Sequence, residues 1–260
     1  MLQPPIEPHI NLTPSSKHIS TALLPPKKKS EYCKLVGLLM YLSVMIHPDL
    51  TSALTVLACY LKQAHTIHME AGLHVLWYIK VTREFHLTLE GKDFVLSGYS
   101  DANWGIELHG HSILGFIFST GTSVISWSLK KQPIITLYFT ESKYIMLSHA
   151  TKEEKWLQTL AHKILPVVGF GFYVKNFNPT VLYCNNQRAI KLSTNPIFDA
   201  HTKHIDIHFH FIHQTITSCD LQLIYCPTNT MVADIMTKQL TCVKFTHQED
   251  DGGSGSKQVN

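Results

Sequence analysis

The sequence predicts an α/β protein, with a mixed sheet flanked by helices and a small helical segment before it. Apolar residues recur at helical spacing between residues 31 and 84, which is typical of amphipathic helices. Alternating apolar and polar residues then indicate short strands, and the later strands alternate with helices. With 260 residues, 45% of them hydrophobic, the chain can bury a substantial core.

The first part of the chain divides into a leader and three helices. Residues 1–30 are rich in Pro, Ser, Thr and Lys without an apolar period, which predicts a disordered leader. In residues 31–84, leucines at i, i+3, i+4 and i+7 from Leu35 mark the inner face of a first helix. Pro48 suits the first turn of a second helix, and Thr66 can cap a third. We expect these helices to pack as a core and to carry no chemistry.

Residues 85–240 contain the predicted sheet. Strands are expected at residues 85–89, 94–100, 112–119, 123–129, 180–184 and 221–226. The third and fourth of these would form a hairpin across Thr120 and Gly121, which are typical turn residues. Helices are expected at about residues 137–166, 187–192, 204–213 and 231–240. Residues 241–260 are acidic and rich in Gly and Ser, which predicts a disordered tail.

Composition and targeting signals indicate where the chain would act. Its net charge of +3 at pH 7 is too mild to indicate nucleic-acid binding by itself. The N-terminus lacks a signal-peptide pattern, and the longest apolar run, residues 35–46, is shorter than the ~20 residues that cross a bilayer. Six cysteines without a CxxC pair favour reduced thiols. We therefore expect an intracellular protein, cytoplasmic or nuclear, without membrane contact. The lysines at residues 27–29 could serve nuclear import or lie in a solvated linker.

Three acidic residues from distant segments are candidates for one catalytic site. Asp101 ends the strand predicted at residues 94–100, Glu141 opens a helix, and Asp234 lies in the first turn of the last helix. The pair Asn185 and Asn186 follows another strand, where an acid is expected. Clustered carboxylates repel one another unless a divalent cation lies between them, and Mg²⁺ or Mn²⁺ prefers such oxygen ligands. The alternative is that Glu141 and Asp234 only stabilise the N-termini of their helices.

The histidines raise the possibility of a zinc site. His204 and His208 are one helical turn apart, and His201 and His213 are close in sequence. The chain lacks an HExxH pattern there, so a polar helix face is the preferred interpretation.

Several motifs together resemble one known family. The segments GYSDANW, ISWSLKKQP, TESKY, LYCNNQRAIKLSTNPIFDAHTKHIDIHFHFI and VADIMTKQL closely resemble, in this order, the ribonuclease H domain of copia-type LTR retrotransposon Pol polyproteins. YCKLVGLLMYL and HPDL resemble the segment that joins reverse transcriptase to that domain. The resemblance spans residues 32–240. It implies a helical remnant of the reverse transcriptase connection at residues 31–84 and a ribonuclease H-like domain at residues 85–240.

The resemblance also implies a fold and an activity. The family fold is a five-stranded mixed sheet flanked by helices, and its activity is metal-dependent cleavage of the RNA strand of an RNA/DNA hybrid. Asp101, Glu141 and Asp234 match the catalytic acids, which would hold Mg²⁺ or Mn²⁺, as two ions if the enzyme is active. The fourth catalytic acid of the family falls on Asn185, a degenerate position whose amide brings no charge.

The change at Asn185 leads us to expect feeble or absent cleavage by an intact fold. Substitution of Asn185→Asp is predicted to tighten Mg²⁺ binding and to raise cleavage. The alternative function is that of a non-catalytic nucleic-acid-binding or interaction module, with RNA/DNA hybrids or other Pol-derived chains as partners. Candidate phosphate contacts, which could equally be ordinary surface residues, are Lys130, Lys131, Arg188, Lys203 and His204.

Overall fold

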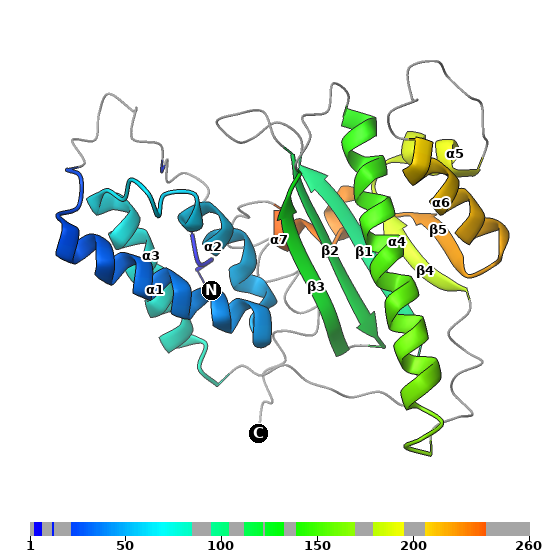
Figure 1. Ribbon diagram of the computed structural model, residues 1–260, viewed down its shortest axis with the longest axis horizontal. Coiled ribbons are helices and arrows are strands. Elements are labelled where there is room, and N and C mark those ends of the chain that lie inside the picture. The colour runs from blue at the N-terminus through cyan, green and yellow to red at the C-terminus, as the bar shows by residue number, and fades with distance from the viewer. Residues whose placement is uncertain are drawn as a thin grey trace. The chain divides into compact units, whose positions relative to one another are not determined.

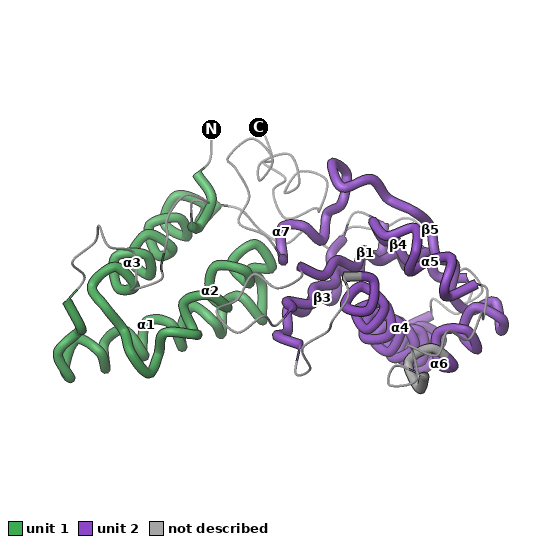
Figure 2. Tube along the Cα trace, turned by 90° about the horizontal axis from the view of Figure 1, so that it is seen from above, with its two compact units in different colours: residues 1–88, 238–260 green, residues 89–237 purple. Residues whose placement is uncertain are grey.

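The described part of the chain forms two compact units. The computed structural model describes residues 3–6, 12, 22–84, 95–103, 112–121, 123–132, 139–169, 179–194 and 206–237. One unit comprises residues 1–88 and 238–260, and the other comprises residues 89–237 (Figure 2). Among the helices in the described ranges, none combines the length and the apolar character needed to span a membrane.

The first unit is built from helices. They are α1 (Pro26–Met45), a 3₁₀ turn (Pro48–Leu50), α2 (Thr51–Ala58) and α3 (Thr66–Val81) (Figure 1). Proline at the start of α1 and of the 3₁₀ turn fits these places, because the first helical N–H groups have no partner within a helix. Buried Asp49 accepts a hydrogen bond of 2.6 Å from the hydroxyl of Tyr78, which ties the 3₁₀ turn to α3.

Part of the predicted leader belongs to the fold of this unit. Helix α1 begins at Pro26 rather than near residue 31. The backbone N–H of Leu24 donates to the carbonyl of Ala64 at 2.9 Å, and Ile6 and Leu12 are buried. The expectation of disorder throughout residues 1–30 is therefore wrong for these positions. Isolated apolar residues in a polar segment can still be buried in a core.

The second unit contains a five-stranded mixed sheet, which confirms the predicted fold class. Its strands lie in the order β3-β2-β1-β4-β5. β1 pairs antiparallel with β2, and β2 with β3, whereas β4 is parallel to both β1 and β5. The strands are β1 (Leu96–Asn103), β2 (Ile113–Thr120), β3 (Ser123–Lys131), β4 (Thr180–Cys184) and β5 (Leu221–Tyr225).

Two of the strands expected from the sequence are not found as expected: one lies outside the described residues and the other is longer. The strand expected at residues 85–89 lies outside the described residues. β1 continues to Asn103, beyond the expected end at residue 100, so Asp101 lies within the strand and not just after it.

Within β1, Gly98 is opposite Phe118, whose ring would lie only 2.4 Å from an added Cβ. A glycine is therefore needed at that point of the sheet.

Helices cover both faces of the sheet. They are α4 (Phe139–Ile164), α5 (Gln187–Thr194), α6 (Asp206–Thr217) and the short α7 (Asp234–Thr237). α4 crosses one face of the sheet and packs on β1 and β2, while α7 lies on the opposite face (Figures 1 and 2). α7 begins later than the helix expected at residues 231–240, because Met231 has an extended backbone after the 3₁₀ turn at residues 228–230. Residues 238–240 lie outside the described part.

The main core lies between the sheet and α4. Large side chains from both layers are buried there, among them Phe118, Tyr144, Leu147 and Leu182. On the α7 face, Tyr99 and Tyr183 stack with ring centroids 4.8 Å apart beside a smaller buried cluster that contains Met231. The functional candidates therefore lie at one end of a sheet that is held by packing on both faces.

Candidate active site

Parallel pairing of β1 with β4 brings Asp101 and Asn185 together. Ser100 is paired with Cys184, so the next residue of each chain segment lies at the same end of the sheet. Asn185 Nδ2 donates a hydrogen bond of 2.9 Å to Asp101 Oδ1. The carboxylate of Asp101 is fully buried, with 0% of its surface exposed.

Helix α4 contributes a cation to the same carboxylate oxygen. Lys143 Nζ donates to Asp101 Oδ1 and forms a salt bridge with it. The Lys143 side chain is only 3% exposed. It lies on the buried stripe of α4 with Leu147 and Ala150, at spacings of four and three residues. The ammonium group is therefore held at Asp101 and is largely shielded from water.

The end of α7 contributes a third donor. Thr237 Oγ1 donates to Asp101 Oδ2 at 2.6 Å, and Asn103 Nδ2 donates to the Thr237 carbonyl at 3.0 Å. Gly115 is paired with Asp101 across β1 and β2. A Cβ at Gly115 would lie 2.7 Å from Thr237 Cγ2, so the missing side chain lets α7 approach the sheet. Both oxygens of Asp101 are thereby engaged by protein donors.

Glu141 and Asp234, the other two candidate acids, are both buried near the starts of helices. Glu141 is 7% exposed in the first turn of α4, and Asp234 is fully buried in the first turn of α7. Residues two apart in an α-helix project about 200° apart. Glu141 and Lys143 therefore leave different sides of the α4 backbone. Among the described residues, no group of three His, Cys, Asp or Glu side chains is placed to hold a metal ion.

The donors around Asp101 do not fit the divalent ions that the family resemblance implies. Mg²⁺ and Mn²⁺ bind oxygen ligands, among them negatively charged carboxylates. Here the ammonium of Lys143 and the amide N–H of Asn185 share Asp101 Oδ1. Asn185 Oδ1 is buried without a hydrogen-bond partner in the described part of the chain, but it is a single neutral oxygen.

Asn186, next to Asn185, has a structural role. Its Oδ1 accepts a hydrogen bond of 2.9 Å from the backbone N–H of Ala189. This caps α5, because the first N–H groups of a helix have no partner within it. Of the two asparagines, only Asn185 faces Asp101.

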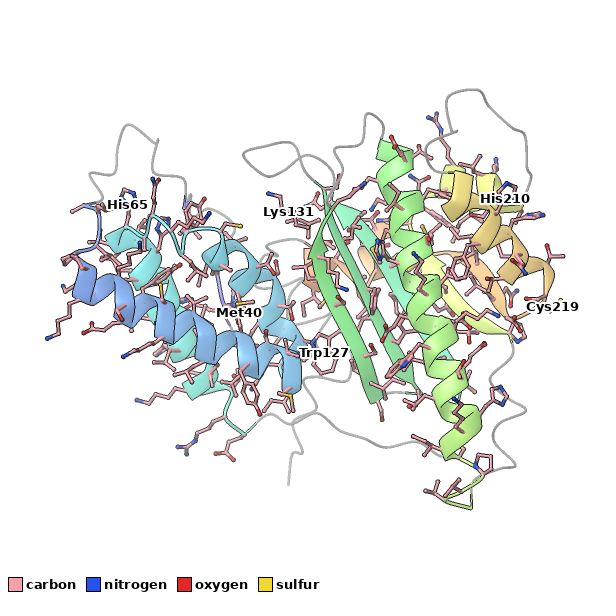
Figure 3. All side chains as sticks on the ribbon, viewed as in Figure 1. Met40, His65, Trp127, Lys131, His210 and Cys219 are labelled. Atoms are coloured by element: carbon pink, nitrogen blue, oxygen red, sulfur yellow. The ribbon has the colours of Figure 1, made fainter. Side chains whose placement is uncertain are left out.

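The candidate phosphate-binding residues are distributed along this end of the sheet. Lys131 is paired with Ile113, which in turn is paired with Asn103, so all three lie in one row across the strands. Lys131 is exposed at the end of β3 (Figure 3), and Lys130 precedes it and is also exposed. Lys203 and His204 lie outside the described residues.

Arg188 is a further exposed candidate, three residues after Asn185 in the first turn of α5. Of the histidines considered for zinc, His201 and His204 are outside the described part, and His213 Nδ1 lies 3.3 Å from the Ser193 carbonyl oxygen.

Sequence reasoning missed Lys143, Thr237 and Gly115 as members of the site. A signal for Lys143 existed, because it shares the helical period of buried Leu147 and Ala150. A lysine on such an apolar stripe predicts a buried partner of opposite charge. No comparable pattern marks Thr237 or Gly115, whose positions depend on how α7 packs on β2.

Comparisons with known proteins show which proteins the chain is similar to. No protein-family model matches it. The retrovirus-related Pol polyprotein from transposon TNT 1-94 of Nicotiana tabacum is 33% identical over 218 residues, 84% of this chain and 16% of that polyprotein. The Pol polyprotein from transposon RE2 of Arabidopsis thaliana is 33% identical over 230 residues, 88% of this chain and 15% of that polyprotein. The chain thus spans less than a fifth of the length of these relatives.

Two further similarities are shorter or more distant. Secreted RxLR effector protein 161 of Plasmopara viticola is 36% identical over 132 residues, which cover 50% of this chain and 93% of that protein. The crystal structure of RNase H1 from Halobacterium salinarum is 15% identical with a TM-score of 0.35, covering 53% of this chain and 89% of that one.

The second unit of this chain is a five-stranded mixed sheet flanked by helices. The chain's homologues are copia-type retrotransposon Pol polyproteins, at 30–33% identity over most of the chain.

Proposed function

We propose that the second unit is a ribonuclease H-like domain that binds RNA/DNA hybrids and cleaves their RNA strand feebly or not at all. The observation that supports this most strongly is the engagement of Asp101. Its two carboxylate oxygens accept hydrogen bonds from Lys143, Asn185 and Thr237, which leaves the central acid of the site neutralised by protein groups. A hydrolytic site that depends on divalent ions would need this carboxylate for the metal.

The basic residues support retained binding to nucleic acid. Neighbouring strands are about 4.8 Å apart, so the backbone of Lys131 lies roughly 10 Å from that of Asn103, next to Asp101. Lys130 precedes it, and Arg188 follows the neighbouring strand β4. Exposed cations near this end of the sheet can contact phosphates without reading the sequence of the bases.

Binding and cleavage can be measured separately on a labelled RNA/DNA hybrid. We expect wild-type protein to bind the hybrid with an affinity that falls as salt is raised. Each phosphate contact contributes about one to the slope of log affinity against log salt. Lys130→Ala/Lys131→Ala should therefore reduce that slope by about two. Lys163→Ala, an exposed lysine in the last turn of α4, is the matched control and should leave the affinity nearly unchanged.

Cleavage is tested on the same hybrid with Mg²⁺ and with Mn²⁺. We expect little or no cleavage, and the residual rate should be the same in Asp101→Asn. Robust metal-dependent cleavage that Asp101→Asn abolishes would show that the site is an active nuclease. Equal binding by wild type and the Lys130→Ala/Lys131→Ala variant would contradict the proposed binding surface.

A further inference from the structure

We infer that Lys143 is a built-in cation that takes the place of a divalent ion at Asp101, so that Lys143, more than Asn185, prevents metal binding. This deepens the proposed function by naming the residue that excludes the metal. Its test uses metal ions alone, without nucleic acid, and can therefore fail independently of hybrid binding.

The geometry makes the ammonium a fixed part of the site. Lys143 is 3% exposed and Asp101 is 0% exposed, and their charged groups are in contact. The aliphatic part of Lys143 emerges from a buried stripe of α4 that continues in Leu147 and Ala150. Because protein interiors are close-packed, a long side chain buried in this way has few alternative rotamers that would carry its charge away from the carboxylate.

The charges of Asp101 and Lys143 together disfavour binding of a divalent ion. A buried carboxylate needs a partner of opposite charge, and Lys143 supplies one. A divalent ion bound to Asp101 would lie within a few ångströms of this ammonium group. Repulsion at such a distance, at the effective dielectric of a protein, weakens divalent binding by a few powers of ten.

Asn185 contributes less to metal exclusion than the sequence suggests. Its Nδ2 donates to the same Asp101 oxygen that Lys143 contacts. Substitution of Asn185→Asp would therefore place a second carboxylate within reach of the ammonium group, which would partly neutralise it. We expect this single change to leave metal affinity low, in contrast to the expectation from the sequence alone.

Metal binding by four full-length proteins tests the inference. They are wild type, Asn185→Asp, Lys143→Glu and Lys143→Glu/Asn185→Asp, each titrated with Mn²⁺ by calorimetry and melted with and without Mn²⁺. We expect binding, and a Mn²⁺-dependent rise in melting temperature, only in the two proteins that lack the ammonium group. Their affinity should exceed that of wild type by a few powers of ten, and the double variant should bind most tightly.

The matched control is Lys155→Glu. Lys155 is on the same helix and forms a salt bridge with Asp220, so this change also places an acid opposite a carboxylate. That pair is partly exposed, at 35% and 22%, and away from Asp101, so no comparable gain in Mn²⁺ affinity is expected. If Lys143→Glu does not fold without metal, Lys143→Gln removes the charge more gently and should still bind Mn²⁺ more tightly than wild type.

Two results would overturn the inference. One is Mn²⁺ binding by wild type or Asn185→Asp that disappears in the corresponding Asp101→Asn variant. The other is a gain in affinity for Lys143→Glu and Lys143→Gln no larger than that for Lys155→Glu.

Discussion

Replacing Lys143 with methionine removes the positive charge from Asp101 and keeps a side chain of similar length. The structure then leaves a fully buried carboxylate that accepts hydrogen bonds from the amide of Asn185 and the hydroxyl of Thr237 and has lost the ammonium group. Breaking a buried ion pair by removing one partner lowers the free energy of unfolding by about 3–5 kcal/mol. The two remaining hydrogen bonds offset part of this loss, so we expect a value near the lower end of that range.

Urea unfolding followed by circular dichroism measures the change. The double variant Lys143→Met/Asp101→Asn should recover much of the lost stability, because no isolated charge remains buried. Lys155→Met is the control: its partly exposed pair with Asp220 should contribute no more than about 1 kcal/mol. A loss in Lys143→Met no larger than that in Lys155→Met would refute the buried ion pair, as would a double variant less stable than Lys143→Met.

Three further predictions concern other parts of the chain. Gly115→Ala should displace Thr237 from Asp101 and destabilise the domain by about 1–3 kcal/mol in a melting experiment, because the added Cβ overlaps Thr237 Cγ2; equal stability would show that α7 is not held closely there. Burial raises the pKa of Glu154 to about 7 from its ordinary value of 4.5, although Thr180 and Lys155 lower it. The protonated form therefore contributes about 3 kcal/mol of stability that is fully present below pH 4.5 and lost as the pH rises through about 7. Glu154→Gln should accordingly stabilise the protein at pH 8 much more than at pH 4.5, and a pH-independent effect in urea titrations would contradict this. The chain contains no Tyr-x-Asp-Asp motif, so we expect no primer extension by the purified protein on a primed template, and measurable DNA synthesis would refute that expectation.

Much of the fold could be predicted from the sequence because the local patterns and the tertiary structure agree. Alternation in residues 123–129 predicts a half-buried strand, and β3 is that strand. The sequence predicts too late a start for α1, because Pro26 and the lysines after it have the composition of a polar leader, although proline suits a first helical turn. Local composition does not show that Ile6 and Leu12 are buried against distant residues.

The site was predictable only in part. Placing Asn185 beside Asp101 follows from the family resemblance, and in the structure the Asn185 amide donates a hydrogen bond to Asp101. The motif drew attention to Glu141, whereas Lys143, two residues later, faces the carboxylate. Choosing between them requires the rotation of α4 about its axis, which is set by the packing of its buried stripe on the sheet.

A crystal of the full chain soaked in Mn²⁺ and measured by anomalous scattering tests the central claim most directly. We predict no anomalous peak within coordination distance of Asp101, and Lys143 Nζ in contact with its carboxylate. A Mn²⁺ peak on the Asp101 carboxylate, with the Lys143 side chain turned away, would contradict it.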